Sequence, residues 1–392
     1  MPHAFPIIDA DSHVYEPPEL WTSFLSANER TLAEEAFWYE RGPAGSELTV
    51  VNGKAVRSLN RSKLNRYACF RPGETPESIG QLDPSAEFED NPGAVLGSAR
   101  LRDLDALGID RQVVYPTLFA EHLPVVESPR AAVALARAYN DWVTKLCSEG
   151  DDRLHPVAVL PLQSVPGTLA EIERVAGAGF GAVLLRPSFI GGRFLNHSEY
   201  DPVWQAIEET ELVACIHPSV GSTNPEFTSA GAFVERVAGN LDIGHDIAAS
   251  IAPVQDNMAA VLALAYYGHL ENHPKLKLSL SHAGASWFEL ALEKAETYLW
   301  LFPGRLPVSL EPERLWLERE TAVAFDAWED SVGIIPEVYG QVGVWGSRYP
   351  HHDTSTPDEA VAMLERHGVA ADTIAAMLGG NAARIFGLPT DS

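Results

Sequence analysis

The sequence has few cysteines, few basic residues and no long apolar run. Its three cysteines, Cys69, Cys147 and Cys215, lie far apart without CxxC spacing. A disulfide framework and a thiolate zinc site are therefore disfavoured. No apolar stretch approaches the roughly 20 residues of a membrane span. The N-terminus carries acidic residues where a signal peptide requires a basic flank and an apolar run, so we expect a cytoplasmic protein.

Positive charge is scarce along the chain. Lysine and arginine total 28 against 54 aspartates and glutamates, which gives a formal net charge of -26. Such an excess of negative charge disfavours binding to nucleic acid and to anionic membranes, because their phosphates would be repelled. Walker A, strand-to-helix GxGxxG and GxSxG motifs are also missing, so neither a nucleotide site nor a nucleophile elbow is indicated. The expected partner is a small-molecule substrate.

Short apolar runs alternate with helical patterns over the 392 residues. Continuous apolar strands separated by helices predict a parallel sheet that is buried on both faces. Eight such units predict a (β/α)8 TIM barrel rather than an open doubly wound sheet. The expected strands lie within residues 5–13, 110–118, 155–162, 181–188, 212–219, 276–284, 321–329 and 340–347.

We expect one domain over residues 1–392, interrupted by two inserts. Residues 20–98 contain no clean βα unit, and the stretch "FRPGETPESIGQLDPSAEFEDNPGA" is typical of a loop. This insert follows the first strand on the face where barrel active sites are built, so we expect a cap or lid. A disordered insert is the alternative. The second insert, residues 219–246, follows the fifth strand.

Polar residues gather where the expected strands end, which is where barrel enzymes place their catalytic side chains. Asp11 and His13 end the first strand, and residues i and i+2 of a strand face the same way. His217 ends the fifth strand and His282 the sixth. One such histidine alone is usually ordinary packing, but three with a carboxylate indicate a functional cluster. Carboxylate and imidazole ligands suit a divalent metal ion.

The loop after the eighth strand reads "WGSRYPHHD" and adds Arg348, His351, His352 and Asp353, while the fourth strand contributes Arg186. We assign Arg186, Arg348 and His352 to substrate binding. The predicted catalytic residues are His13, His217, His282, Arg348, His351 and Asp353. The predicted metal ligands are Asp11, His13 and His217.

Several stretches resemble, in order, the amidohydrolase-related (amidohydrolase-2) family, which includes aminocarboxymuconate semialdehyde decarboxylase and resorcylate-type decarboxylases. The stretches are "IIDADSHVYEPPELW", "RLRDLDALGIDRQVVYPT", "AYNDWV", "DRLHPVAVLPL", "YDPVWQAIEETELVACIHPS", "SHAG", "WGSRYPHHD" and "GGNAARIFGL". The resemblance covers nearly the whole chain outside the two inserts. It implies a barrel enzyme, of the lyase or hydrolase type, that acts on a small carboxylated or aromatic molecule with Zn²⁺ or another divalent metal. A homodimer is compatible with the resemblance, but the sequence does not determine the oligomeric state.

The resemblance also implies roles for single residues. Asp11, His13 and His217 match metal ligands of the family, and His282 matches a histidine that acts on the substrate or on metal-bound water. The family's fourth ligand is the aspartate of a "GSDYP" motif after the eighth strand. That motif reads "GSRYP" here, so Arg348 occupies the place of the aspartate.

Three outcomes follow from this exchange of a carboxylate for a permanent cation. Arg348 turns aside and the metal is kept; or Arg348 replaces the metal and pairs with Asp11; or the site is inactive and only binds a small molecule. In the metal-free case the histidines carry out acid–base catalysis. Hydrolysis by a metal-bound hydroxide is disfavoured, because the missing aspartate takes the proton from water. We therefore expect a lyase-type reaction, namely decarboxylation, dehydration or ring closure, with a metal-dependent hydrolase or decarboxylase as the alternative.

Overall fold

The structure, a computed structural model, describes residues 3–41, 47–56, 65–82, 89–218, 246–265, 268–302 and 312–390. Eight parallel strands form one sheet in the order β1-β5-β6-β7-β8-β9-β10-β11. Their bounds are β1 Ile8–His13, β5 Arg111–Tyr115, β6 Leu154–Val159, β7 Ala182–Leu185, β8 Val213–Ile216, β9 Lys277–Leu280, β10 Thr321–Phe325 and β11 Gly343–Trp345. Each predicted strand is present, and the (β/α)8 barrel is confirmed.

The ends of the sheet meet between β1 and β11, which brings the last strand beside the first. The backbone N–H of Ser347 donates to Asp9 Oδ1 at 2.9 Å, and that of Arg348 donates to the carbonyl oxygen of Asp11 at 2.8 Å. The residues that follow β11 therefore lie beside the polar end of β1. We call the rim formed by the carboxyl ends of the eight strands the mouth of the barrel.

Alternate side chains of the strands face the inside and the outside of the barrel, and both faces are buried. In β7, Ala182 and Leu184 pack in one cluster with residues of most other barrel strands. Val183 and Leu185 pack in the larger cluster, which includes residues of the surrounding helices. Burial on both faces explains why the strands are continuous apolar runs rather than alternating ones.

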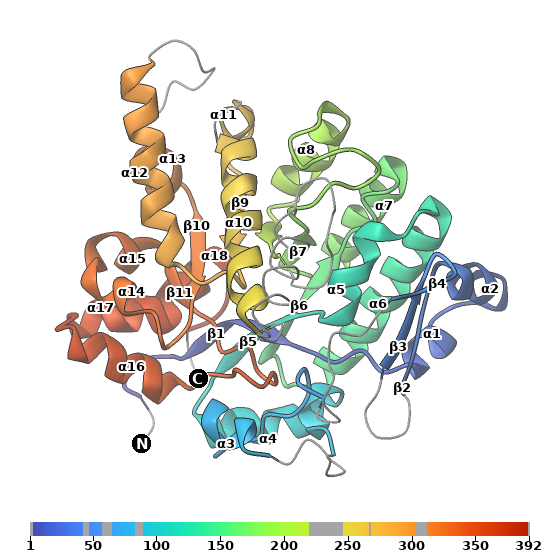
Figure 1. The fold of residues 1–392 in the computed structure, drawn as a ribbon, viewed down its shortest axis with the longest axis horizontal. Helices are drawn as coiled ribbons and strands as arrows, with labels where there is room; N and C mark the ends of the chain where they lie inside the picture. The colour runs from blue at the N-terminus through green and yellow to red at the C-terminus, as the bar shows by residue number, and fades with distance from the viewer. Residues whose placement is uncertain are drawn as a thin grey trace.

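Helices surround the strands (Figure 1). Their bounds are α1 Glu19–Ser23, α2 Ala27–Ala36, α3 Pro76–Gly80, α4 Gly97–Leu107, α5 Leu118–His122, α6 Pro129–Ser148, α7 Val165–Gly177, α8 Asp201–Glu209, α10 Asp246–Ala265, α11 His269–Asn272, α12 Ser286–Leu301, α13 Pro312–Leu317, α14 Asp330–Ile334, α15 Pro336–Val342, α16 Pro357–Arg366, α17 Ala371–Ala375 and α18 Asn381–Phe386. Local signals set their starts: the Ser128 side chain accepts from the Ala131 N–H at the start of α6, as an N-cap does. Among the described residues, no helix is both long and apolar enough to cross a membrane.

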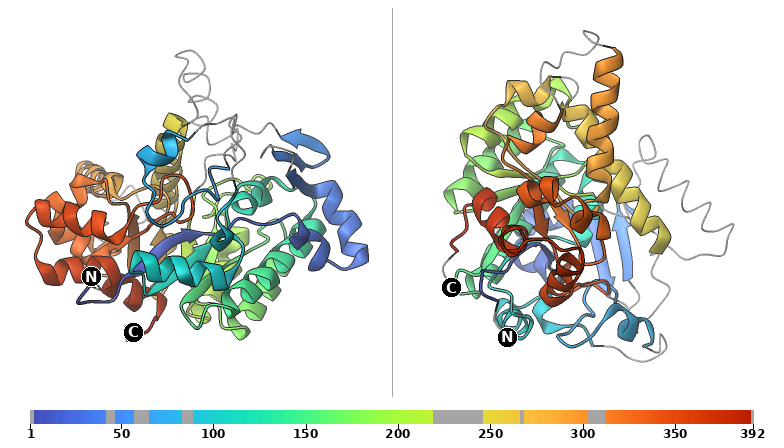
Figure 2. Two further views of the ribbon diagram at one scale, coloured as in Figure 1. Left: turned by 90° about the horizontal axis from the view of Figure 1, so that it is seen from below. Right: turned by 90° about the vertical axis from the view of Figure 1, so that its left-hand side faces the viewer.

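The described part of the first insert contains structure that its composition did not predict. Strands β2 Phe37–Arg41, β3 Glu47–Val51 and β4 Lys54–Val56 form a small antiparallel sheet, which Figure 2 shows outside the ring of barrel strands. Further along the insert, the Phe70 N–H donates to Pro350 O at 3.0 Å and the His352 N–H donates to Arg66 O at 2.7 Å. This part of the insert therefore lies against the loop after β11. Residues 219–245, nearly all of the second insert, lie outside the described residues.

Candidate metal centre

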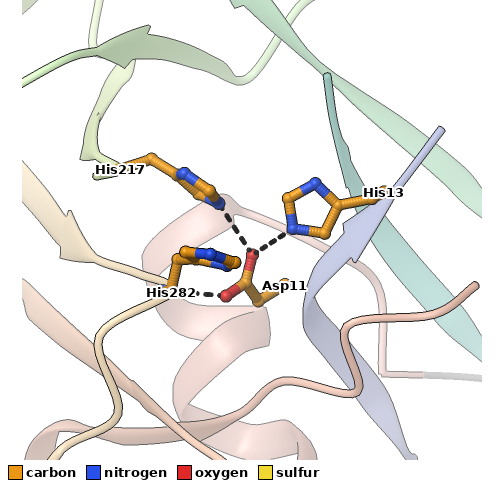
Figure 3. A group of neighbouring side chains, drawn as sticks. All are labelled: Asp11, His13, His217 and His282. Atoms are coloured by element: carbon orange, nitrogen blue, oxygen red, sulfur yellow. Dashed lines mark hydrogen bonds and ion pairs between the residues drawn. The ribbon is translucent and has the colours of Figure 1, made fainter. Parts of the chain in front are cut away.

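Four ionisable side chains from three strand ends meet at the mouth (Figure 3). Asp11 and His13 belong to β1, while His217 follows β8 and His282 follows β9. Each offers one ligand atom, and these atoms lie within 4.8 Å of one another. Asp11 Oδ1 lies 3.5 Å from His13 Nε2 and 3.3 Å from His217 Nε2. The structure thus brings together the four residues that the strand ends indicated.

Backbone carbonyl groups determine which nitrogen of two histidines faces Asp11. His13 Nδ1 lies 2.9 Å from the carbonyl oxygen of Pro116, and His217 Nδ1 lies 2.7 Å from that of Pro218. A carbonyl oxygen only accepts, so Nδ1 carries the proton of the neutral ring and Nε2 presents a lone pair. Both lone pairs point toward the carboxylate of Asp11, whose oxygens likewise only accept hydrogen bonds.

Several atoms of this cluster lack a hydrogen-bond partner within the described part of the chain. They are Asp11 Oδ1, His13 Nε2, His217 Nε2 and His282 Nδ1. A buried polar atom without a partner costs about 1–3 kcal/mol. A cation among these acceptors would satisfy them together, and carboxylate oxygen and imidazole nitrogen are ligands for divalent first-row metals. The residues therefore fit a divalent metal ion.

Burial and neighbouring charges also favour the protonation states that bind a cation. Burial raises the pKa of Asp11, and a proton on His13 or His217 beside it lowers that pKa well below its usual value. Burial lowers the pKa of His217. Burial and the nearby charges of His217 and Arg348 hold the pKa of His282 well below its usual value. An ionised Asp11 and neutral imidazoles at 217 and 282 are the expected forms at neutral pH.

Two non-glycine residues at the mouth adopt the left-handed backbone conformation, His282 with φ 61° and Arg348 with φ 60°. This conformation costs roughly 1–2 kcal/mol for most residues. Both residues use it to donate a backbone N–H to Asp11. The His282 N–H reaches Oδ2 at 2.9 Å, and the Arg348 N–H reaches the carbonyl oxygen at 2.8 Å. Asp11 is thus held in place from two further strand ends.

The guanidinium of Arg348 is bound by two carboxylates. Its Nη1 lies 2.6 Å from Asp353 Oδ2, and its Nη2 lies 3.2 Å from Asp326 Oδ2. Burial would lower the pKa of Arg348, but the charges of Asp353 and Asp326 outweigh burial and raise it. Burial would raise the pKa of Asp353, but the Arg348 charge lowers it. The guanidinium is thus paired with Asp326 and Asp353, and whether a metal is kept beside it stays a prediction.

Asp326 was not among the predicted site residues. It directly follows β10, so the signal was a polar residue at a strand end, within "AFDAWE". It lines a small pocket at the mouth with Asp11, His282 and Arg348. The predicted set thus missed one of the acidic groups that the barrel brings to its mouth.

The other predicted residues of the strand-eight loop occupy different surroundings. The His351 ring stacks on His13 with centroids 4.3 Å apart, and its Nε2 lies 3.1 Å from Thr117 Oγ1. His351 therefore supports a residue of the metal centre. The His352 side chain is 36% exposed, and its Nδ1 lies 3.9 Å from Asp353 Oδ1. His352 thus stands at the rim of the mouth.

Arg186 follows β7 and is buried at the wall of a second pocket. Burial lowers its pKa to about 10, while the charges of Asp256 and Glu121 raise it. Burial raises the pKa of Asp256 to about 7, against the charge of Arg186. The Arg186 charge also lowers the pKa of His217, which places the pocket near the metal centre. The pocket is otherwise lined by Ala120, Leu123, Pro124, Val159, Leu160, Leu162, Gln163, Leu184 and Ile190.

The amidohydrolase family model, Amidohydro_2, matches residues 8–388. This chain belongs to the amidohydrolase family. The predicted family is confirmed, and the chain is an enzyme of that family, as the sequence indicated.

Individual relatives of this chain are decarboxylases. Decarboxylase yanB of Aspergillus niger is 26% identical over 262 residues, which are 64% of this chain and 67% of the relative. A gamma-resorcylate decarboxylase of Rhizobium sp. is 26% identical over 193 residues, 47% of this chain. This amidohydrolase spans 54% of the length of that resorcylate enzyme.

Solved structures share the fold of this amidohydrolase. An amidohydrolase from Mycobacterium avium subsp. paratuberculosis superposes with a TM-score of 0.77 at 18% identity, covering 98% of this chain and 100% of the other. A dihydroxybenzoic acid decarboxylase from Polaromonas sp., solved with manganese and 2-nitroresorcinol, superposes with a TM-score of 0.65 at 16% identity. That comparison covers 98% of this chain and 97% of the other.

Proposed function

We propose that this chain is a metal-dependent decarboxylase of small aromatic carboxylates. The observation that carries the proposal is the set of acceptor atoms of Asp11, His13 and His217, which face one another without hydrogen-bond partners among the described residues. Decarboxylase relatives and a manganese-containing structural neighbour support it. A metal-free reaction is less well supported, because the Arg348 guanidinium is already neutralised by Asp326 and Asp353.

In this reaction the bond between the ring and the carboxylate breaks, CO2 leaves, and the ring carbon takes a proton in its place. A divalent ion held by Asp11, His13 and His217 would supply Lewis-acid stabilisation of negative charge. The Pro116 and Pro218 carbonyl groups orient the two imidazoles, as the outer partners of ligating histidines do. His351 supports the His13 ring from the other side by stacking.

Other residues bind the substrate and hold the proton. The pocket beside Arg186 is lined by apolar side chains, and the buried guanidinium suits an anionic group of the substrate. His282 lines the small pocket at the mouth together with Asp326, so its imidazole can hold the proton that goes to the ring carbon. The first insert, whose residues Arg66 and Phe70 bond to the strand-eight loop, would cap this substrate site.

The test supplies the metal-loaded chain with hydroxybenzoates labelled with ¹³C in the carboxyl group, 2,6-dihydroxybenzoate among them. We expect release of ¹³CO2 and, in heavy water, one deuterium at the vacated ring carbon. Release should stop in the His217→Ala variant and after treatment with a chelator. Hydrolysis of an amide or ester analogue without any release of CO2 from the panel would contradict the proposal.

A further inference from the structure

We infer that His282 is a fourth metal ligand, so that the ion lies among three imidazoles and one carboxylate. This inference rests on the metal centre proposed above. The His282 ring stacks on the His217 ring with centroids 4.7 Å apart and an interplanar angle of 23°, and it meets the His13 ring edge-on at 5.6 Å. Figure 3 shows its imidazole beside those of His13 and His217 around Asp11. Its Nδ1 is one of the atoms without a hydrogen-bond partner among the described residues.

The backbone at His282 supports a ligand role. A histidine at φ 61° is strained relative to glycine, and such strain persists where the surroundings determine the conformation. Here the hydrogen bond from the His282 N–H to Asp11 Oδ2 holds the strained residue against the carboxylate of the centre. The same bond leaves Asp11 Oδ1 facing the histidine nitrogens. This one hydrogen bond thus orients both His282 and Asp11.

The ion pairs of Arg348 explain why the four-residue group that the described residues form contains only one carboxylate. Its backbone lies against Asp11, but its side chain holds Asp326 and Asp353, the acidic groups nearest to it. Neither acid is a member of the group of four ligand atoms that the described residues form. A divalent ion with one carboxylate ligand keeps a net positive charge. Imidazole-rich sets suit zinc, whereas carboxylates suit manganese, so we expect this chain to favour Zn²⁺ over Mn²⁺.

The assignment also separates the roles of two residues. A histidine whose Nδ1 binds the ion cannot hold the proton for the ring carbon on that nitrogen. The proton for the ring carbon would then be carried on the other ring nitrogen of His282, because Asp326 is ionised in its pair with Arg348. Arg348 becomes a positioning residue, since it acts by holding Asp326 and Asp353.

The test measures metal binding without substrate, so its result does not depend on whether the chain decarboxylates anything. Metal-depleted full-length protein is titrated with Zn²⁺ and with Mn²⁺, and the Co²⁺ form is examined by visible absorption. The ligand variant is His282→Gly, because glycine tolerates φ 61° and only the imidazole is removed. We expect Zn²⁺ affinity to fall more than about 100-fold, beyond the roughly 10–100-fold that loss of an outer partner causes. The Co²⁺ spectrum should change as well.

Two further variants serve as comparisons. His351→Phe removes a neighbouring imidazole outside the set but keeps an aromatic ring on His13, and it should preserve the Co²⁺ spectrum. Compared with Arg348→Asn, Arg348→Asp should raise the affinity for Mn²⁺ relative to Zn²⁺ by about tenfold. Asparagine and aspartate both tolerate the left-handed backbone, but only aspartate adds a charged carboxylate ligand. An unchanged Zn²⁺ affinity and Co²⁺ spectrum in His282→Gly would overturn the inference, and His282 would then be a proton carrier only.

Discussion

The ion pair between Arg348 and Asp353 gives the sharpest prediction for stability. The two side chains are 20% and 30% exposed and approach to 2.6 Å. Exposed pairs contribute about 0.2–1 kcal/mol, whereas breaking a buried pair costs about 3–5 kcal/mol. We therefore expect a coupling free energy of about 1.5–3 kcal/mol from the double-mutant cycle of Arg348→Asn and Asp353→Asn. Arg348→Asn alone should lower the free energy of unfolding by less than the loss of two ion pairs would, because asparagine relieves part of the roughly 1–2 kcal/mol of backbone strain.

The coupling should depend on pH with a definite sign. The Arg348 charge holds the pKa of Asp353 in the folded state below its unfolded value, which is near 3.9. A carboxylate with a lowered pKa stabilises the folded state above the unfolded pKa, and this contribution is lost as the pH falls toward the folded pKa. The coupling should therefore be constant between about pH 5 and pH 8 and should shrink below about pH 4.

The assay is urea unfolding of the metal-free protein, followed by tryptophan fluorescence with a chelator present. The surface pair of Arg366 and Asp330, whose side chains are 63% and 59% exposed, is the matched control and should show no measurable coupling. A coupling below about 0.5 kcal/mol for Arg348 and Asp353 at pH 7, typical of an exposed pair, would refute the reasoning. A coupling that grows on acidification would refute it equally.

The remaining predictions concern the site. Gly346→Ala would place a Cβ 2.6 Å from that of Asp11, so we expect a lower melting temperature and reduced metal occupancy, measured by thermal unfolding and elemental analysis. Arg186→Met should raise KM for an aromatic carboxylate roughly 10–100-fold and change kcat less. The reason is the loss of a buried charged hydrogen bond, which contributes about 1.5–3 kcal/mol. An unchanged KM would exclude Arg186 as the anion site. Asp326→Asn removes one of the two carboxylates that hold Arg348, so we expect a lower kcat and an unchanged Zn²⁺ affinity, whereas equal losses of both would indicate a structural role.

The barrel and the meeting of Asp11, His13, His217 and His282 at its mouth could be predicted because both follow from short-range patterns. Continuous apolar strands alternate with helices, and the parallel arrangement brings every strand's carboxyl end to one rim. Residues as distant as Asp11 and His282 then meet without any long-range signal in the sequence. The spacing of Asp11 and His13 on one strand was sufficient to place both side chains in the mouth, as Figure 3 shows.

The direction of the Arg348 side chain could not be predicted, because it depends on a left-handed backbone and on a partner on another strand. The motif alone left open whether the guanidinium would face Asp11 or turn aside. Its partner Asp326 escaped notice because one acid at the end of a weak strand pattern resembles an ordinary surface residue. The small sheet β2-β3-β4 was missed because its strands are only three to five residues long and the Asn52-Gly53 pair between β3 and β4, which is a hairpin signal, was overlooked.

The most direct test of the proposed metal centre is the metal content of the purified chain together with the effect of its removal. We expect about one divalent ion per chain, bound by the cluster around Asp11, and a loss of that ion in the His217→Ala variant. Decarboxylation should cease in the chelated protein and return when Zn²⁺ or Mn²⁺ is added. Full turnover by a metal-depleted chain would contradict the proposal and would favour the alternative in which Arg348 replaces the metal.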